Sequence, residues 1–237
     1  MTIDIFCDVI DNFGDAGVCW RLASIFSCEH GFPVKLYIND AETLSKITAG
    51  LDPKKLPCLV QGVEIHDWKD AETSEPSQVV IETFGCRLPI AFEHKIAAAR
   101  PQPIWINLEY LSAEDWVEGC HSLPSPHPSL NVNKYYFFPG VTKKTGGLMI
   151  EKDLFIRQER FAKDRNKSFA IPARRWLNFI KHSGSAAKKS ICFFRRVQLL
   201  IFCPSFMRNI HPEIFSLEFQ RWFLNLNLTN FYGPRIL

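Results

Sequence analysis

The sequence predicts an α/β fold with a mostly parallel sheet over its first 160 residues, and two observations support this prediction. Short apolar runs alternate with stretches of helical period, as strands and helices do along a parallel sheet. The first apolar run leads directly into the loop "DNFGDAG", where Gly14 and Gly17 permit a tight turn into a helix. After about residue 161 this alternation is lost.

The individual elements follow from the residue pattern. We expect a buried strand at 2–10, then a helix from Gly14 that Gly31 ends. A strand at 33–40 precedes a helix at 41–51, for which Asp40 is the N-cap candidate. Later strands are expected at 63–68, 78–85, 103–110 and 134–140; later helices at 89–100, opened by Pro89, and at 112–119, where Ser112 and Asp115 have capping-box spacing.

Composition excludes several classes of protein. Apolar residues make up 46% of the chain, enough for a real core, yet no run approaches the roughly 20 residues of a membrane span. The N-terminus lacks the basic and apolar stretches of a signal peptide. Eight scattered cysteines without a CxxC pair indicate reduced thiols, so we expect a cytoplasmic protein without a zinc site or disulfide framework.

The net charge of +3 hides a strong asymmetry. Residues 1–150 contain 12 Lys and Arg against 19 Asp and Glu, a net charge of −7. Residues 151–237 contain 16 against 6, a net charge of +10. A basic tail that binds nucleic acid is one explanation, although composition alone is a weak signal for it. The other explanation is that the second part of the chain has a different origin.

Polar residues gather where the predicted strands end, and ligands bind at the carboxyl ends of strands in open α/β sheets. These are the Asp11–Asp15 loop, Glu82 and Thr83, Asn107, Glu109 and Tyr110, and the loop 123–126. Free N–H groups at the helix start favour an anion there, either a phosphate or a carboxylate of the protein.

Each of these features also has a structural explanation. Asp11 or Asp15 can simply cap the helix, and Glu109 can be a surface residue. The aromatic side chains of Trp20, Phe26 and Trp105 are expected in the core. The histidines show no metal-ligand spacing, and the full GxGxxG of nicotinamide-dependent enzymes is absent, which argues against an oxidoreductase.

Four longer stretches carry a resemblance to a known family. "DVIDNFGDAGVCWRLA", "VVIETFGCRLP", "NLEYLSAEDWVEGCHSLPSPHP" and "KYYFFPGVTKKTGGLMIEKDL" resemble the bacterial protein-arginine rhamnosyltransferases that mature elongation factor P. The resemblance runs from the start to about residue 160. It implies a GT-B fold with two Rossmann-like halves, and inverting transfer of rhamnose from dTDP-β-L-rhamnose to an arginine of elongation factor P, without a metal or cofactor.

The resemblance also implies roles for individual residues. Asp15, the second aspartate of the DNFGD motif, corresponds to the catalytic base, with Asp11 in support. Asn12, Phe13 and Gly14 would line the donor side of the cleft, while Glu109 and Tyr110 would help to hold the substrate. An arginine guanidinium, with a pKa above about 12, needs carboxylates of this kind to become a nucleophile.

Residues 161–237 do not resemble the second half that such an enzyme needs. We therefore predict two segments: a Rossmann-like acceptor-side domain at 1–160, and a basic segment at 161–237 that is disordered or translated out of frame, with the donor domain missing. A truncated enzyme that is inactive alone is the favoured interpretation. The alternative is a non-catalytic α/β binding module that recognises elongation factor P.

Overall fold

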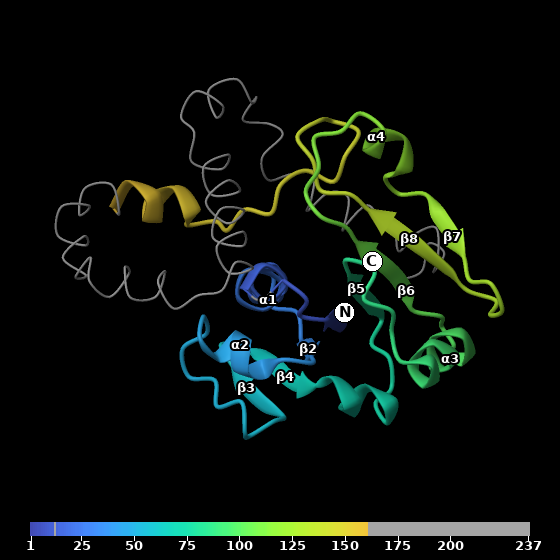
Figure 1. The fold of residues 1–237 in the computed structure, drawn as a ribbon, viewed down its shortest axis with the longest axis horizontal. Coiled ribbons are helices and arrows are strands. Elements are labelled where there is room, and N and C mark those ends of the chain that lie inside the picture. Colours follow the sequence, from blue (N-terminus) through green and yellow to red (C-terminus); the bar gives the residue numbers. More distant parts are fainter. Residues whose placement is uncertain (12, 161–237) are drawn as a thin grey trace. The chain divides into compact units, whose positions relative to one another are not determined.

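The structure is a computed structural model that describes residues 1–11 and 13–160 (Figure 1). Of these, 1–149 belong to one compact unit and 150–160 to a second. The described part of the second unit is helical at 154–160, where Arg157 Nε pairs with Asp153 Oδ1 at 3.0 Å. The expectations for Asn12 and for residues 161–237 lie outside the described residues.

The first unit is built on an eight-stranded sheet with the order β3-β4-β2-β1-β5-β6-β8-β7. Its six central strands are parallel, and β3 and β7 add antiparallel edges. In chain order, the parallel strands have the 3-2-1-4-5-6 arrangement of the Rossmann fold. The strands are β1 (Ile3–Cys7), β2 (Val34–Ile38), β3 (Cys58–Val60), β4 (Val63–Asp67), β5 (Val79–Thr83), β6 (Ile104–Leu108), β7 (Pro124–Pro126) and β8 (Asn133–Phe137).

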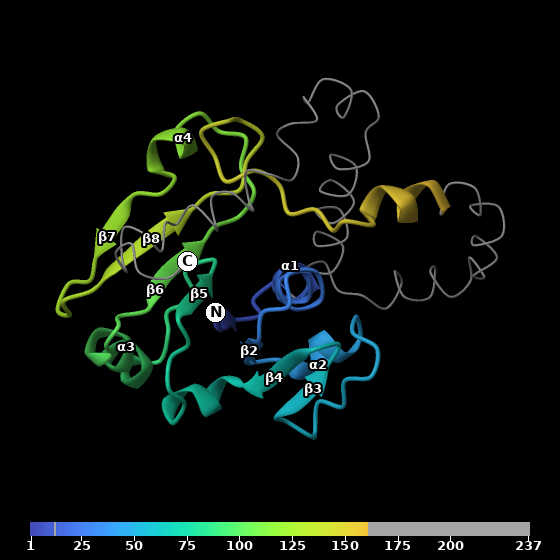
Figure 2. The ribbon, with the colours of Figure 1, turned by 180° about the vertical axis from the view of Figure 1, so that it is seen from behind.

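Helices lie on both sides of this sheet, as Figures 1 and 2 show. Helix α1 and helix α2 lie on one side, and the 3-10 helix η2 and helix α3 lie on the other. A short helix, α4, precedes β7. The helical bounds are α1 (Phe13–Ser24), its π-helical continuation η1 (Ile25–Glu29), α2 (Ala41–Ser45), η2 (Trp68–Glu72), α3 (Ile90–Ala98) and α4 (Val117–Cys120).

The two faces of the sheet bury two apolar clusters. The cluster under α1 contains Leu22 and Phe26, and the cluster under α3 contains Phe92 and Trp105. Because both faces are covered, β1 and β5 are buried at every position, which explains why most of their residues are apolar. The one aspartate within β1, Asp4, is fully buried and accepts hydrogen bonds from the backbone and hydroxyl of Ser77.

The predicted α/β fold with a mostly parallel sheet is confirmed for the described residues. Several local details are also confirmed: Asp40 caps α2 through the Thr43 N–H at 2.9 Å, α3 starts after Pro89, and Gly31 ends the first helix with φ +69°. The first strand ends earlier than expected, at Cys7, which leaves 8–11 as the loop that enters α1.

Three local predictions are wrong. The helix expected at 41–51 ends at Ser45. The helix at 112–119 begins only at Val117, because the Ser112 hydroxyl accepts the N–H of Glu114 two residues on and forms a turn instead of a capping box. Segment 123–126 is not a loop at the ligand edge. It contains the edge strand β7, which is separated from β1 by β5, β6 and β8.

Candidate functional site

The candidate site lies where the strand order reverses, between β1 and β5, at the carboxyl ends of the strands. Three segments meet there: the loop from β1 into α1, the turn after β5, and the residues that follow β6. The polar and aromatic side chains of these segments are connected by hydrogen bonds and one ring contact, through residues 11, 15, 84, 107 and 110.

Asp15 lies at the centre of this arrangement. It is in the first turn of α1 and only 1% exposed. Its Oδ2 accepts the N–H groups of Ile10 at 3.0 Å and Asp11 at 2.8 Å, and its Oδ1 accepts the Tyr110 hydroxyl at 2.9 Å. The carboxylate therefore reaches back to the loop before the helix. The positive end of the α1 dipole also favours a negative charge there.

Tyr110 brings β6 into contact with α1. Its ring stacks on Phe84 with centroids 3.9 Å apart and planes 4° from parallel, while its hydroxyl donates to Asp15. Burial and the neighbouring Asp15 carboxylate raise the pKa of Tyr110, so the hydroxyl remains a proton donor at neutral pH. About half of the Tyr110 side chain, 48%, is exposed, so this aromatic pair forms part of the surface beside Asp15.

Phe84 sits in a tight turn with an unusual backbone. The Cys86 N–H donates to the Thr83 carbonyl at 3.1 Å, and both central residues have positive φ, +57° at Phe84 and +67° at Gly85. These are the features of a type I′ turn, which normally has Asn, Asp or Gly at its first central position. A bulky residue in this conformation costs roughly 1–2 kcal/mol, so other contacts must hold Phe84 there.

The loop before α1 places Asp11 beside Gly14. The Gly14 N–H donates to the Asp11 carbonyl at 2.9 Å, and a Cβ at Gly14 would lie 3.1 Å from Asp11 Oδ2. Glycine at this position therefore lets the Asp11 carboxylate approach the helix start. Phe13, half-buried, begins α1.

Glu109 is close in sequence to Tyr110 but faces a different neighbour. Its Oε1 accepts from Asn107 Nδ2 at 2.5 Å, and Asn107 Oδ1 in turn accepts the Gly85 N–H at 3.0 Å. Asn107 pairs in register with Glu82 of β5, on the α3 side of the sheet. The structure thus brings Asp11, Asp15 and Tyr110 together, and it directs Glu109 toward Asn107.

Glu82 and Thr83, expected at the same edge, lie on opposite faces of β5. The Thr83 hydroxyl donates to the Phe6 carbonyl at 2.7 Å and lies 3.3 Å from Cys19 Sγ of α1. The Glu82 carboxylate is buried on the other face, where it accepts from Trp105 Nε1 at 3.0 Å and pairs with Lys134 at 2.5 Å. Burial raises the pKa of Glu82, and Lys134 opposes this shift. Glu82 is therefore part of the core and not of the site.

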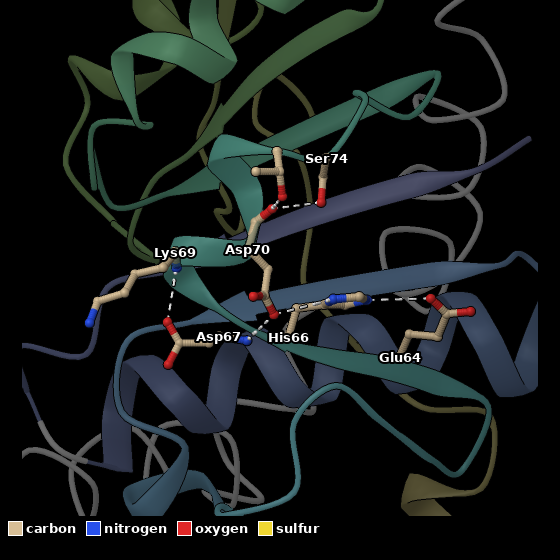
Figure 3. A network of polar contacts seen from close by, with 7 residues as sticks. Glu64, His66, Asp67, Lys69, Asp70 and Ser74 are labelled. Carbon is tan, nitrogen blue, oxygen red and sulfur yellow. Dashed lines mark hydrogen bonds and ion pairs between the residues drawn. The ribbon is translucent and has the colours of Figure 1, made fainter.

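A second cluster of titratable side chains lies on β4 and on η2, which follows it, and has a structural role (Figure 3). His66 Nε2 lies 3.4 Å from Glu64 Oε2, and its Nδ1 lies 3.7 Å from Asp70 Oδ2. Asp70 accepts the N–H of Asp67 at 3.2 Å, while Asp67 caps the start of η2 in a capping box. These contacts stabilise a helix start two strands away from β1.

Phe84 is the residue of this site that sequence reasoning missed. The signal was present in the motif "ETFG", since an aromatic residue followed by glycine directly after a buried strand is unusual for a tight turn. Within residues 1–11 and 13–160, no group of three or more His, Cys, Asp or Glu side chains is placed to hold a metal ion. The expectation of metal-free chemistry remains a prediction.

The fold and the site together define a Rossmann-like α/β domain with carboxylates at the switch point of its sheet. The chain belongs to the EarP family, described as elongation factor P (EF-P) rhamnosyltransferase, whose profile matches residues 3–204. The resemblance found in the sequence is thereby confirmed. The profile match also continues past residue 160, where we had placed the end of the resemblance.

Individual relatives give the same assignment. The chain is 47% identical over 161 residues to a protein-arginine rhamnosyltransferase of Pseudomonas putida, and 45% identical over 169 residues to one of Shewanella oneidensis. A relative from Neisseria meningitidis is 43% identical over 153 residues. The first two alignments cover 68% of this chain and 42% of the relative, so the chain spans about two fifths of their length.

Two further findings concern the described residues. In the part that the structure describes, no helix is both long and apolar enough to cross a membrane. The six cysteines among the described residues, from Cys7 to Cys120, are all free thiols.

Proposed function

We propose that this chain provides the acceptor-side half of a GT-B protein-arginine rhamnosyltransferase. The reaction is inverting transfer of rhamnose from dTDP-β-L-rhamnose to an arginine of elongation factor P in the cytoplasm, without a metal or cofactor. The observation that carries the proposal is the family match over residues 3–204. The relatives named above are protein-arginine rhamnosyltransferases, which supports the reaction class.

Asp15 is the base in this proposal, because its carboxylate still has acceptor capacity. A carboxylate offers about four acceptor positions, and three are taken by Ile10, Asp11 and Tyr110. A remaining position on Oδ1 takes the proton from the attacking guanidinium nitrogen. Removal of this proton converts a poor nucleophile into one that displaces the diphosphate from the opposite face of the sugar.

Asp11 supports Asp15 by adding negative charge beside the guanidinium, at a distance that Gly14 permits. Asn12, Phe13 and Gly14 form the donor side of the site. Tyr110 and Glu109 contribute to the acceptor side, where Tyr110 presents a half-exposed ring. The net charge of −7 over residues 1–150 suits a basic acceptor surface on elongation factor P.

A second candidate function is a binding module that recognises elongation factor P without turnover. The observation that favours it is the environment of Asp15, which is only 1% exposed and already accepts three hydrogen bonds, as a structural carboxylate does. In the GT-B arrangement the nucleotide sugar is held mainly by the other half. We therefore propose that the 237-residue polypeptide alone neither binds dTDP-rhamnose measurably nor transfers rhamnose.

One experiment separates the two candidates. A chimera joins residues 1–160 of this chain to the remainder of the Pseudomonas putida relative, and it is assayed beside the 237-residue polypeptide for rhamnose transfer and for binding of elongation factor P. Transfer by the chimera supports the enzyme. Binding without transfer by the chimera supports the module, and tight dTDP-rhamnose binding by the polypeptide contradicts our proposal. In either case, binding should weaken as salt rises, because exposed charge pairs are screened.

A further inference from the structure

Hydrogen bonds connect the turn after β5 to the end of β6, the strand that precedes Tyr110. The Phe84 N–H donates to the Leu108 carbonyl at 2.7 Å, and the Gly85 N–H donates to Asn107 Oδ1 at 3.0 Å. Both acceptors belong to the end of β6, two and three residues before Tyr110. The turn is therefore fixed to the same strand end that presents Tyr110.

The left-handed backbone of this turn places an aromatic ring where the usual turn residues have none. With φ at +57°, Phe84 projects its ring onto Tyr110, and the two planes lie within 4° of parallel. Asparagine or glycine would fit the backbone better but would leave one face of Tyr110 without this neighbour. The strained backbone of Phe84 therefore allows the ring contact with Tyr110.

Tyr110 needs such a neighbour because half of it faces solvent. An exposed tyrosine exchanges between rotamers, and only one rotamer places its hydroxyl on Asp15 Oδ1. Contact with a second ring favours the rotamer in which the Tyr110 ring is stacked on Phe84. Phe84 thus biases the rotamer that supplies the third hydrogen bond of Asp15.

We propose that Phe84 is a positioning residue, which holds the Tyr110 hydroxyl on Asp15 through the ring stack and so fixes the orientation of the Asp15 carboxylate. The role of Asp15 as the base rests on the proposed function. Phe84 itself touches neither Asp15 nor the substrate in this scheme. Its effect is transmitted entirely by Tyr110.

The first test measures the hydrogen bond directly in the 237-residue chain. We expect the Tyr110 hydroxyl proton, assigned by its loss in Tyr110→Phe, to exchange with water several-fold faster in Phe84→Asn than in the wild type. Asparagine suits the turn, so the backbone is retained. Phe84→Tyr keeps a ring and is expected to exchange at the wild-type rate. Equal exchange rates in Phe84→Asn and the wild type would overturn the proposal.

The second test uses kcat for rhamnose transfer in the chimera described above. We expect Phe84→Asn to lower kcat about 3- to 10-fold with little change in KM, and Phe84→Tyr to restore it. In a Tyr110→Phe background, Phe84→Asn should cause less than a twofold further loss, because its only route to Asp15 is already removed.

The two tests fail in different ways. A wild-type chimera that transfers no rhamnose would refute the proposed function, and the hydroxyl exchange would then decide the positioning role alone. Equal losses from Phe84→Asn in both backgrounds would show that Phe84 acts on folding or on a different contact. That result would overturn the positioning role even in an active enzyme.

Discussion

Replacement of Asp15 by alanine and by asparagine should affect stability and catalysis in different proportions. The side chain has a structural task, since it accepts two backbone N–H groups and the Tyr110 hydroxyl. It also has the proposed catalytic task. The two substitutions separate these tasks, because asparagine keeps an acceptor oxygen and alanine does not.

The magnitude follows from the contacts. Asp15→Ala leaves the N–H groups of Ile10 and Asp11 without their acceptor, at about 1–3 kcal/mol each when buried. Since Ile10 is exposed and water can replace part of the loss, we expect a decrease of about 2–4 kcal/mol in the free energy of unfolding. In Asp15→Asn, the single amide oxygen can still accept both N–H groups. The free energy of unfolding should therefore decrease by only about 1–2 kcal/mol, mainly because the hydrogen bonds are no longer strengthened by a charge.

The assay is urea unfolding of the 237-residue chain, together with hydrogen exchange at the amides of Ile10 and Asp11. Both amides should exchange faster in Asp15→Ala than in Asp15→Asn. Asp40→Asn is the matched control, because Asp40 caps α2 and asparagine caps a helix about as well as aspartate. It should change the free energy of unfolding by less than about 0.5 kcal/mol.

Rhamnose transfer by the chimera gives the catalytic part. Asp15→Asn should lower the rate by roughly 10²–10⁴, the usual contribution of a general base, although it retains most of the stability. A wild-type rate in Asp15→Asn would refute the assignment of Asp15 as the base. An unfolding free energy unchanged in Asp15→Ala would refute the structural part of the reasoning.

Three further predictions concern stability. Burial raises the pKa of Asp4, so its contribution to stability is present below about pH 4 and is lost as pH rises through the folded pKa. The free energy of unfolding in urea should therefore decrease less between pH 4 and pH 8 in Asp4→Asn than in the wild type. Lys134→Met leaves Glu82 buried without its cation and should cost about 3–5 kcal/mol at pH 8, less at pH 5, where protonation removes part of the buried charge. Asp70→Ala removes one half of the η2 capping box with Asp67, and thermal unfolding should report a loss of about 1 kcal/mol.

The six parallel strands and the helices α1, α2 and α3 could be predicted from the sequence because each carries its own local signal, whereas β3, β7 and η2 were not predicted. The buried runs of β1 and β5, the N-cap at Asp40 and the stop at Gly31 depend on neighbouring residues alone. The start of the helix at 112–119 was predicted wrongly, because the Ser112 hydroxyl accepts the nearby Glu114 N–H and forms a turn instead of a helix cap.

The candidate site could be predicted only in part. The sequence by itself determined that carboxylates follow the first strand and that polar residues follow the strands at 79–83 and 104–108, since these are linear features of the chain. It also determined the family, because the match extends over long stretches of residues.

Only the tertiary structure decided which of these side chains meet. Glu82 and Thr83 are adjacent in sequence, yet successive side chains of a strand point to opposite faces, so Glu82 joins Trp105 in the core. Tyr110 reaches Asp15 across 95 residues of sequence because β6 and β1 flank β5. Such a contact depends on strand order and on the rotamer of Tyr110, and the residues next to Tyr110 in the sequence set neither of them.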